Sequence, residues 1–361
     1  MRRLISAALL AVLICTMLGP ALASADSESS GQGQFSIGNV APSIQQIKLY
    51  QSDENTIVDG SGNSMTPQQE YALKIVASDG NGYSDITQIT VYIYYATDVS
   101  ASPTGTFDTK QEAIFTWDPS NGWQLSSGGA TTTWTVETNS RGPIDVTTIQ
   151  GTWWLHFKPG KVAHEADGTT AFWIIDVKVQ DSGGLSDEKK NNEEEGGSVL
   201  QYSMQWYGET AIASADLPFD FGAVDLGSSN NPIVSPSEGY IDVYVVANGD
   251  YNLKIKATDS TGANSYWVGQ NHGDQATLTT DSPGDGQIRL KANTENNPSS
   301  ATAFASTYVA LLTGQTGPTD DGSAASGDGA DINIYMWLDV GSSGLIADTY
   351  QGLVWFMVEN G

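Results

Sequence analysis

The chain has 361 residues, a single cysteine (Cys15), and 15 basic against 42 acidic residues, which gives a formal net charge of −27 at pH 7. The negative charge disfavours nucleic acid and direct electrostatic attachment to anionic lipid as partners, because both present negative phosphates. One cysteine excludes an internal disulfide framework and a zinc-thiolate site. The same charge favours divalent cations or a saline medium, or keeps the protein soluble and apart from its neighbours.

Residues 1–25 predict a cleaved export signal. Arg2 and Arg3 form a short basic region, residues 4–18 are almost all apolar, and small residues follow in the spacing of a cleavage site. A retained anchor is the alternative, but the apolar run is shorter than the roughly 20 residues that cross a bilayer. We therefore expect a secreted, extracellular or cell-surface protein with no transmembrane anchor in its mature chain.

Residues 26–38 are rich in Ser, Gly and Gln and predict a flexible lead. The lead ends in an alternating segment that would place Phe35 and Ile37 on one side of an extended chain. Such a segment can add as a strand to an exposed sheet edge of another chain. Two interpretations remain open, a disordered tether and a donated strand that joins copies in a filament or lattice.

Residues 39–207 predict a first immunoglobulin-like β-sandwich domain. Apolar residues alternate with polar ones, as where Ile89, Val91 and Ile93 share one face of a strand, and similar faces recur at 153–157 and 173–179. Turn signals separate many such strands. No segment carries a sustained helical period. This pattern is typical of antiparallel sandwiches with Greek-key connections.

Residues 208–361 predict a second immunoglobulin-like β-sandwich. Two alternating strands, at 241–246 and 253–257, flank an Asn-Gly-Asp sequence at 248–250, which signals a hairpin. Residues 332–340 alternate over a longer stretch, and residues 301–312 fit a short helix and a strand equally well. The predicted fold is thus all-β, with two sandwiches in tandem.

An Asp-rich turn occurs three times, each time after an alternating strand and with a Gly three residues after the Asp. Ca²⁺ binds six to eight oxygens, and such turns present carboxylates, amides and carbonyls. In the alternative interpretation the Asp side chains only brace the turns through backbone N–H groups. The predicted calcium ligands are one set of Asp79, Asn81 and Asp85 and a second set of Asp181 and Asp187, with a further acidic group at Asp320, Asp321, Asp328 and Asp331.

Large aromatic residues lie on strand faces opposite the aliphatic ones. Such faces need cover from a loop, the other domain or a neighbouring subunit, and we expect subunit contacts at Tyr92, Tyr94, Tyr335 and Trp337. Exposed aromatic rings can instead stack on sugars. Trp153 and Trp154 are the predicted rings for a carbohydrate-binding adhesin, and core packing is the alternative for them.

No catalytic motif emerges from the sequence. The three histidines are scattered, and the chain has no nucleophile elbow, no zinc-protease motif and no phosphate-binding glycine loop. We therefore expect a protein that is not an enzyme, with no cofactor other than Ca²⁺.

The segment Asn39-Val40-Ala41-Pro42, followed by residues 71–95 with their Asp-Gly-Asn-Gly-Tyr-Ser-Asp turn, resembles the immunoglobulin-like domains of archaeal secreted surface proteins, methanogen envelope proteins above all. Residues 220–227, 248–251, 338–340 and 344–352 resemble a second module of such proteins. The resemblance implies a structural subunit of a cell surface layer, sheath or extracellular filament, which associates with itself or with other envelope proteins. The resemblance implies no catalytic residues. The chain departs from the pattern in lacking a C-terminal anchor and any Asn-x-Ser/Thr site.

Overall fold

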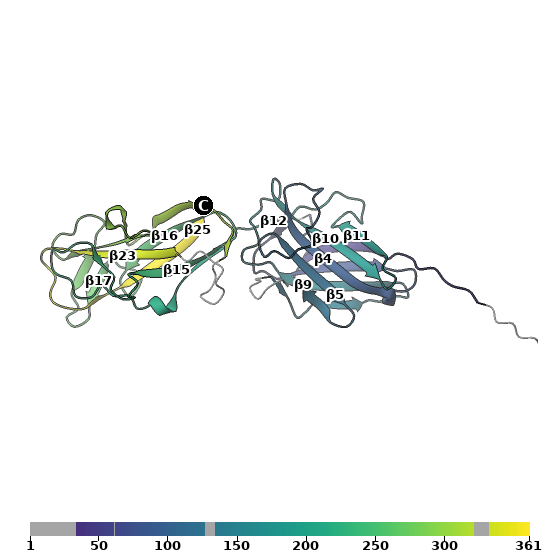
Figure 1. Ribbon diagram of the computed structural model, residues 1–361, viewed down its shortest axis with the longest axis horizontal. Coiled ribbons are helices and arrows are strands. Elements are labelled where there is room, and N and C mark those ends of the chain that lie inside the picture. Colours follow the sequence, from purple (N-terminus) through teal and green to yellow (C-terminus); the bar gives the residue numbers. More distant parts are fainter. Residues whose placement is uncertain (1–33, 61, 127–133, 321–331) are drawn as a thin grey trace, which may run out of the picture. The chain divides into compact units, whose positions relative to one another are not determined.

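The computed structural model describes residues 34–60, 62–126, 134–320 and 332–361 (Figure 1). The predicted export signal and the first part of the lead lie outside the described residues. The chain forms one compact unit from Val40 to Gly361, and the residues up to Asn39 are a separate unit. The predicted all-β class is confirmed. Helical structure in the described residues is confined to three 3-10 turns, η1 (Tyr83–Asp85), η2 (Ser214–Asp216) and η3 (Pro298–Ser300).

Two sheets of the described residues enclose the first hydrophobic core. One sheet has the order β1-β3-β9-β7, with β8 also paired to β9, and the other has the order β11-β10-β4-β5-β6. The strands of the first sheet are β1 (Ser43–Gln51), β3 (Tyr71–Ser78), β7 (Thr135–Val136), β8 (Arg141–Ile144) and β9 (Gln150–Lys158). Those of the second are β4 (Ile86–Ala96), β5 (Glu112–Asp118), β6 (Gly122–Leu125), β10 (Phe172–Asp181) and β11 (Ser186–Lys190).

Alternation along the strands decides which side chains enter this core. On β4 the side chains of Ile89, Val91 and Ile93 are fully buried, as their spacing predicts. The same holds for Trp153, Leu155 and Phe157 on β9, which faces β4 and β10 across the core. Apolar area removed from water stabilises the fold by roughly 25 cal/mol per Å², so these large side chains dominate the stability of the sandwich.

A second core is enclosed by a long sheet and a short one. In the described residues the long sheet has the order β13-β15-β23-β19-β18-β17-β24, and β14, β20 and β22 pair to its strands. Its strands are β13 (Gly208–Ile212), β14 (Asn231–Pro232), β15 (Tyr240–Ala247), β17 (Tyr266–Gly269), β18 (Gln275–Leu278), β19 (Gln287–Asn293), β20 (Thr302–Ala303), β22 (Thr319–Asp320), β23 (Ile332–Val340) and β24 (Tyr350–Gln351). The short sheet has the order β21-β16-β25, with β16 (Tyr251–Thr258), β21 (Val309–Gln315) and β25 (Leu353–Asn360).

The structure departs from the sequence pattern in two respects and settles one choice that the pattern left open. The Asn-Gly-Asp turn at 248–250 joins β15 of the long sheet to β16 of the short one, so it links two layers and does not close a hairpin. Residues 301–312 contain strand residues of β20 and β21, which settles the choice between helix and strand. Two short ladders, β2 (Ser64–Met65) with β12 (Ser203–Met204) and β18 with β19, are parallel where antiparallel pairing is expected.

Candidate functional site

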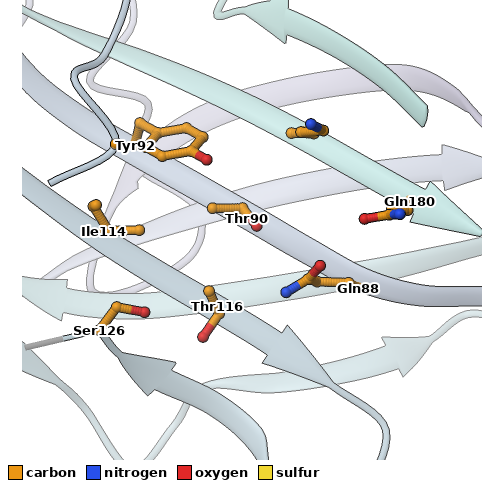
Figure 2. A pocket seen from close by; sticks show the side chains of 9 residues that line it. Gln88, Thr90, Tyr92, Ile114, Thr116, Ser126 and Gln180 are labelled. Carbon is orange, nitrogen blue, oxygen red and sulfur yellow. The ribbon is translucent and has the colours of Figure 1, made fainter. Parts of the chain in front are cut away.

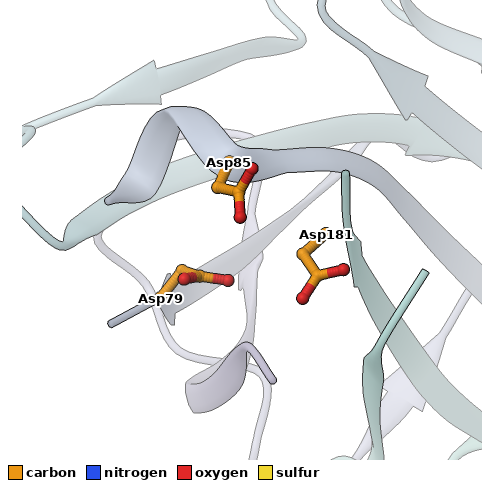
Figure 3. A group of neighbouring side chains, drawn as sticks. All are labelled: Asp79, Asp85 and Asp181. Carbon is orange, nitrogen blue, oxygen red and sulfur yellow. The ribbon is translucent and has the colours of Figure 1, made fainter. Parts of the chain in front are cut away.

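Two of the three Asp-rich turns meet at one end of the first sandwich. Asp79 follows β3 directly, Asp85 ends η1 just before β4, and Asp181 is the last residue of β10. Since β4 and β10 pair, with Asp181 opposite Ile86, the two turns lie side by side. One carboxylate oxygen from each of the three residues lies within 4.8 Å of the others. Figure 3 shows the three carboxylates directed toward one another. We call Asp79, Asp85 and Asp181 the carboxylate triad.

Each triad residue also makes local hydrogen bonds. Asp79 Oδ1 accepts the Asn81 N–H at 2.7 Å, and Asp181 Oδ1 accepts the Leu185 N–H at 2.8 Å. Asp85 Oδ1 accepts the Ser182 hydroxyl, which ties the first turn to the second. The turn-bracing interpretation therefore holds for each side chain at one oxygen or more. Asp79 Oδ2, which has no hydrogen-bond partner among the described residues, decides whether the triad has a further role.

The three carboxylates of the triad repel one another when all are ionised. Asp79 is 1% exposed and Asp181 is 2% exposed. Burial and the neighbouring charges of Asp85 and Asp181 raise the pKa of the Asp79 carboxyl. In the part of the chain that the structure describes, neither Asp79 nor Asp85 forms an ion pair with a lysine or arginine.

The other predicted calcium ligands are engaged elsewhere. Asn81 Oδ1 accepts the N–H of Val40 at 2.8 Å, at the start of the compact unit. Asp187 Oδ2 accepts the Ile44 N–H at 2.8 Å and lies 3.2 Å from Lys189 Nζ. The structure thus replaces the two predicted sets by one group that takes Asp79 and Asp85 from the first and Asp181 from the second. Of the further acidic group, Asp321, Asp328 and Asp331 lie outside the described residues.

In the third Asp-rich turn, the Asp side chain only stabilises its own turn. Both carboxylate oxygens of Asp259 are hydrogen-bonded, to the Thr261 hydroxyl, the Ala263 N–H and the backbone and side-chain amides of Asn264. These donors favour the ionised form and lower the pKa of Asp259. Turns that share an Asp with a Gly three residues later therefore contain a fully hydrogen-bonded carboxylate at Asp259 and an incompletely hydrogen-bonded one at Asp79.

The predicted sugar-stacking rings are buried, so that prediction is wrong. Trp153 is fully buried in the first core, and Trp154 is 7% exposed. The Tyr50 ring packs against the Trp154 ring, with 5.4 Å between the two ring centroids. The cationic groups of Lys74 and Arg141 lie 5.9 and 5.7 Å from the centroid of the Trp154 ring. A sugar cannot stack on a ring that the protein itself covers.

The predicted subunit-contact aromatics divide into two classes. Tyr94 and Trp337 are 3% exposed each, so the chain itself covers them and they offer no surface to a partner. The cover of Tyr94 comes from the loop that follows β4, where its hydroxyl donates to the Ala101 carbonyl at 2.9 Å. Tyr92 and Tyr335 are half-buried and still present part of their rings.

A polar hollow of about 320 Å³ lies on the outer face of the β10-β4-β5 sheet, and the sequence pattern gives no sign of it. Figure 2 shows side chains from neighbouring strands around it. Period-two alternation turns these side chains away from the core, and the hollow arises because small and long polar groups lie next to each other. Its lining includes Gln88, Thr90, Tyr92, Thr116, Lys178 and Gln180.

Three segments are relevant to association between copies of the chain: the lead and the edge strands β1 and β21. In the lead, Phe35 is 86% exposed and Ile37 is 78% exposed. Along β1, an edge strand, the N–H groups of Ile44, Ile47 and Leu49 donate to carboxylate oxygens at 2.8, 2.8 and 3.0 Å. The acceptors are, in the same order, Asp187, Glu194 and Asp59. Along β21, an edge of the short sheet, the seven residues carry no charge.

Each of the three histidines packs against or lies close to side chains of the described residues. His156 is 1% exposed, and its two ring nitrogens lie 2.9 Å from Glu70 Oε1 and 2.8 Å from Glu54 Oε1. His164 stacks on Tyr95 with ring centroids 4.4 Å apart. His272 lies 3.3 Å from a carboxylate oxygen of Asp348, which braces its loop. These contacts account for each histidine by packing or bracing.

In the described part of the chain, no helix is long and apolar enough to cross a membrane.

The comparisons with known proteins identify no family. The sequence matches no protein-family model and no curated protein. Among solved structures, the major pilin subunit BcpA of Bacillus cereus is 8% identical with a TM-score of 0.23, over 86% of this chain and 71% of that chain. A DUF4466 family protein from Parabacteroides merdae is 11% identical with a TM-score of 0.23, over 84% and 100%. A chaperone-tip adhesin complex of CFA/I fimbriae is 11% identical with a TM-score of 0.21, over 90% and 92%.

Proposed function

We propose that this chain is an exported, non-enzymatic structural subunit of a cell surface layer, sheath or extracellular filament, and that copies join by strand addition. The observation that carries the proposal is the exposure of Phe35 and Ile37, at alternate positions of the lead. Large apolar side chains exposed at 86% and 78% are unfavourable in water and are covered when the segment pairs with a sheet edge. The resemblance in sequence to archaeal envelope proteins agrees with this role.

The uncharged edge of β21 is the acceptor that fits best. Edge strands that must stay unpaired are blocked by charges or by side chains on their N–H groups, as β1 is blocked by Asp187, Glu194 and Asp59. The described residues of β21 carry no such charge, and Val309, Leu311 and Leu312 supply apolar contact. We infer that the lead of one copy pairs with β21 of another.

Electron microscopy and size-exclusion chromatography of the purified chain test this function. We expect the native chain to form polymers. Deletion of residues 26–38 and the double substitution Phe35→Ser with Ile37→Ser should abolish them, because both remove the donated strand. Ala310→Lys should also abolish them, because it puts a charge on the exposed acceptor edge. The matched controls are Gln34→Ser with Ser36→Thr, at the intervening positions of the lead, and Ser120→Lys, at an exposed turn away from the edge. These controls should assemble normally.

Glycan binding is the second candidate function, and the polar hollow on the β10-β4-β5 sheet favours it. Amide and hydroxyl groups beside one aromatic ring match the donors, acceptors and flat faces of a sugar. If the chain stays monomeric in every condition, assembly is rejected. Binding on a glycan array that disappears with Thr90→Ala and Gln180→Ala would then establish the adhesin.

A further inference from the structure

The carboxylate triad contains an oxygen that the fold leaves without a partner. Asp79 is 1% exposed, and its Oδ2 has no hydrogen-bond partner among the described residues, while Oδ1 is held by the Asn81 N–H. A buried carboxylate oxygen without a donor costs free energy in the folded state. Figure 3 shows this side chain directed into the space it shares with Asp85 and Asp181.

The spacing of the triad matches the coordination shell of one ion. Ca²⁺ binds oxygens at about 2.3–2.6 Å, so oxygens on opposite sides of the ion lie about 4.6–5.2 Å apart. The three triad oxygens fall within 4.8 Å of one another. Mg²⁺ needs oxygens at about 2.0–2.1 Å in a strict octahedron and keeps most of its waters, so the same spacing suits it less well.

We propose that Asp79, Asp85 and Asp181 bind one Ca²⁺ ion, which joins the turn after β3 to the turn after β10. The three carboxylates supply the negative charge, and waters complete the six to eight oxygens that Ca²⁺ requires. The ion replaces the missing donor at Asp79 Oδ2 and removes the repulsion among the carboxylates. This proposal is independent of strand addition, because its measurements are made on the monomer.

A shared proton is the competing explanation, because a protonated Asp79 could donate from Oδ2 to either neighbouring carboxylate. Asp79→Asn separates the two. The amide keeps the shape of the side chain and the acceptor for the Asn81 N–H, but it removes the charge that an ion needs. In excess chelator, Asp79→Asn should be at least as stable as the native chain under both explanations. Only calcium binding makes it lose a calcium response.

The test is thermal unfolding and titration calorimetry in excess chelator, in CaCl₂ and in MgCl₂. For the native chain we expect one Ca²⁺ per molecule and a rise in Tm of roughly 5 °C or more at a hundredfold excess over Kd, with a smaller response to Mg²⁺. Asp79→Asn and Asp85→Asn should each weaken calcium affinity at least tenfold. Hydrogen exchange should slow at the Asn81 and Leu185 amides when calcium is added, because these donate to the triad.

Asp259→Asn is the matched control, since Asp259 occupies the same turn in the second sandwich with both oxygens satisfied. It should lower Tm without changing calcium affinity. The proposal is overturned if the native chain shows neither calcium heat nor a Tm shift. It is also overturned if Asp79→Asn and Asp85→Asn both keep the native calcium response.

Discussion

Single carboxylates differ in how many of their oxygens the fold supplies with hydrogen-bond donors, and Asp176 on β10 is one that has a buried oxygen without a donor. It is 3% exposed, and its Oδ1 has no hydrogen-bond partner among the described residues. Burial, and then the charge of Glu188, raise the pKa of Asp176 to about 6. Because the folded state holds this proton more tightly than the unfolded state, ionisation of Asp176 destabilises the fold.

Asp176→Asn should therefore stabilise the protein in a pH-dependent way. The penalty for ionising Asp176 develops as the pH rises from about 4, the unfolded value, to about 6, and it is complete above that. We expect the variant to gain about 1–3 kcal/mol in the free energy of unfolding at pH 7.5 and close to none below pH 4. Urea denaturation across this range measures it.

The control for this prediction is Asp281→Asn, at an exposed position, which should leave the stability unchanged. An equal gain for Asp176→Asn at pH 4 and pH 7.5 would show that the effect does not come from ionisation.

Among the elements, β1 pairs with β3 on one side, and the side chains that cover its outer edge explain why no strand of the described residues pairs there. Asp187 comes from β11 and Glu194 from the loop after it, so the end of the second sheet covers the edge of the first. Lys189 reinforces the contact by donating to the Ile44 carbonyl at 3.0 Å. This arrangement satisfies N–H groups that would otherwise recruit another chain.

Removing the caps should open this edge. For Asp187→Ala with Glu194→Ala we expect a loss of about 1–3 kcal/mol in the free energy of unfolding for each N–H left without an acceptor. We also expect faster aggregation, since the freed groups of β1 can pair with another copy. Urea denaturation and light scattering measure the two effects. Glu195→Ala, which removes one negative charge at an exposed neighbouring position, should behave as the native chain does. Aggregation that this control shares with the double variant would refute the edge mechanism.

The sequence predicts which side chains of a strand share a face, but it does not predict which part of the chain packs over that face. Alternation correctly assigns Ile89, Val91 and Ile93 to the core, because a period of two is a local property of an extended chain. Alternation places Tyr94 on the other face, and the same pattern would suit a subunit contact. The structure buries it under the following loop, which Glu112 anchors by accepting the backbone N–H groups of Thr104 and Gly105 at 2.7 and 2.8 Å.

At the scale of the whole molecule, the net charge of −27 opposes association between copies. The Debye length falls from about 30 Å at 0.01 M to about 8 Å at 0.15 M ionic strength, so salt screens this repulsion. We expect polymers of the native chain to increase on raising NaCl across this range in excess chelator, as measured by light scattering. KCl should act equally, since screening depends on ionic strength alone. Polymers that dissolve as NaCl rises would mean that attraction between charges drives assembly.

The all-β class, the strands with strong alternation, the inward side chains and the three Asp-rich turns are predictable from the sequence, because all of these depend on residues close together along the chain. Which turns meet depends on the three-dimensional arrangement of the strands. It joined Asp79 and Asp85 with Asp181, sent Asp187 to the edge of β1, and buried Trp153 and Trp154. These outcomes follow from the pairing of β4 with β10 and from the packing of the two sheets. Contacts between distant segments are set by the whole fold, and no local pattern carries them.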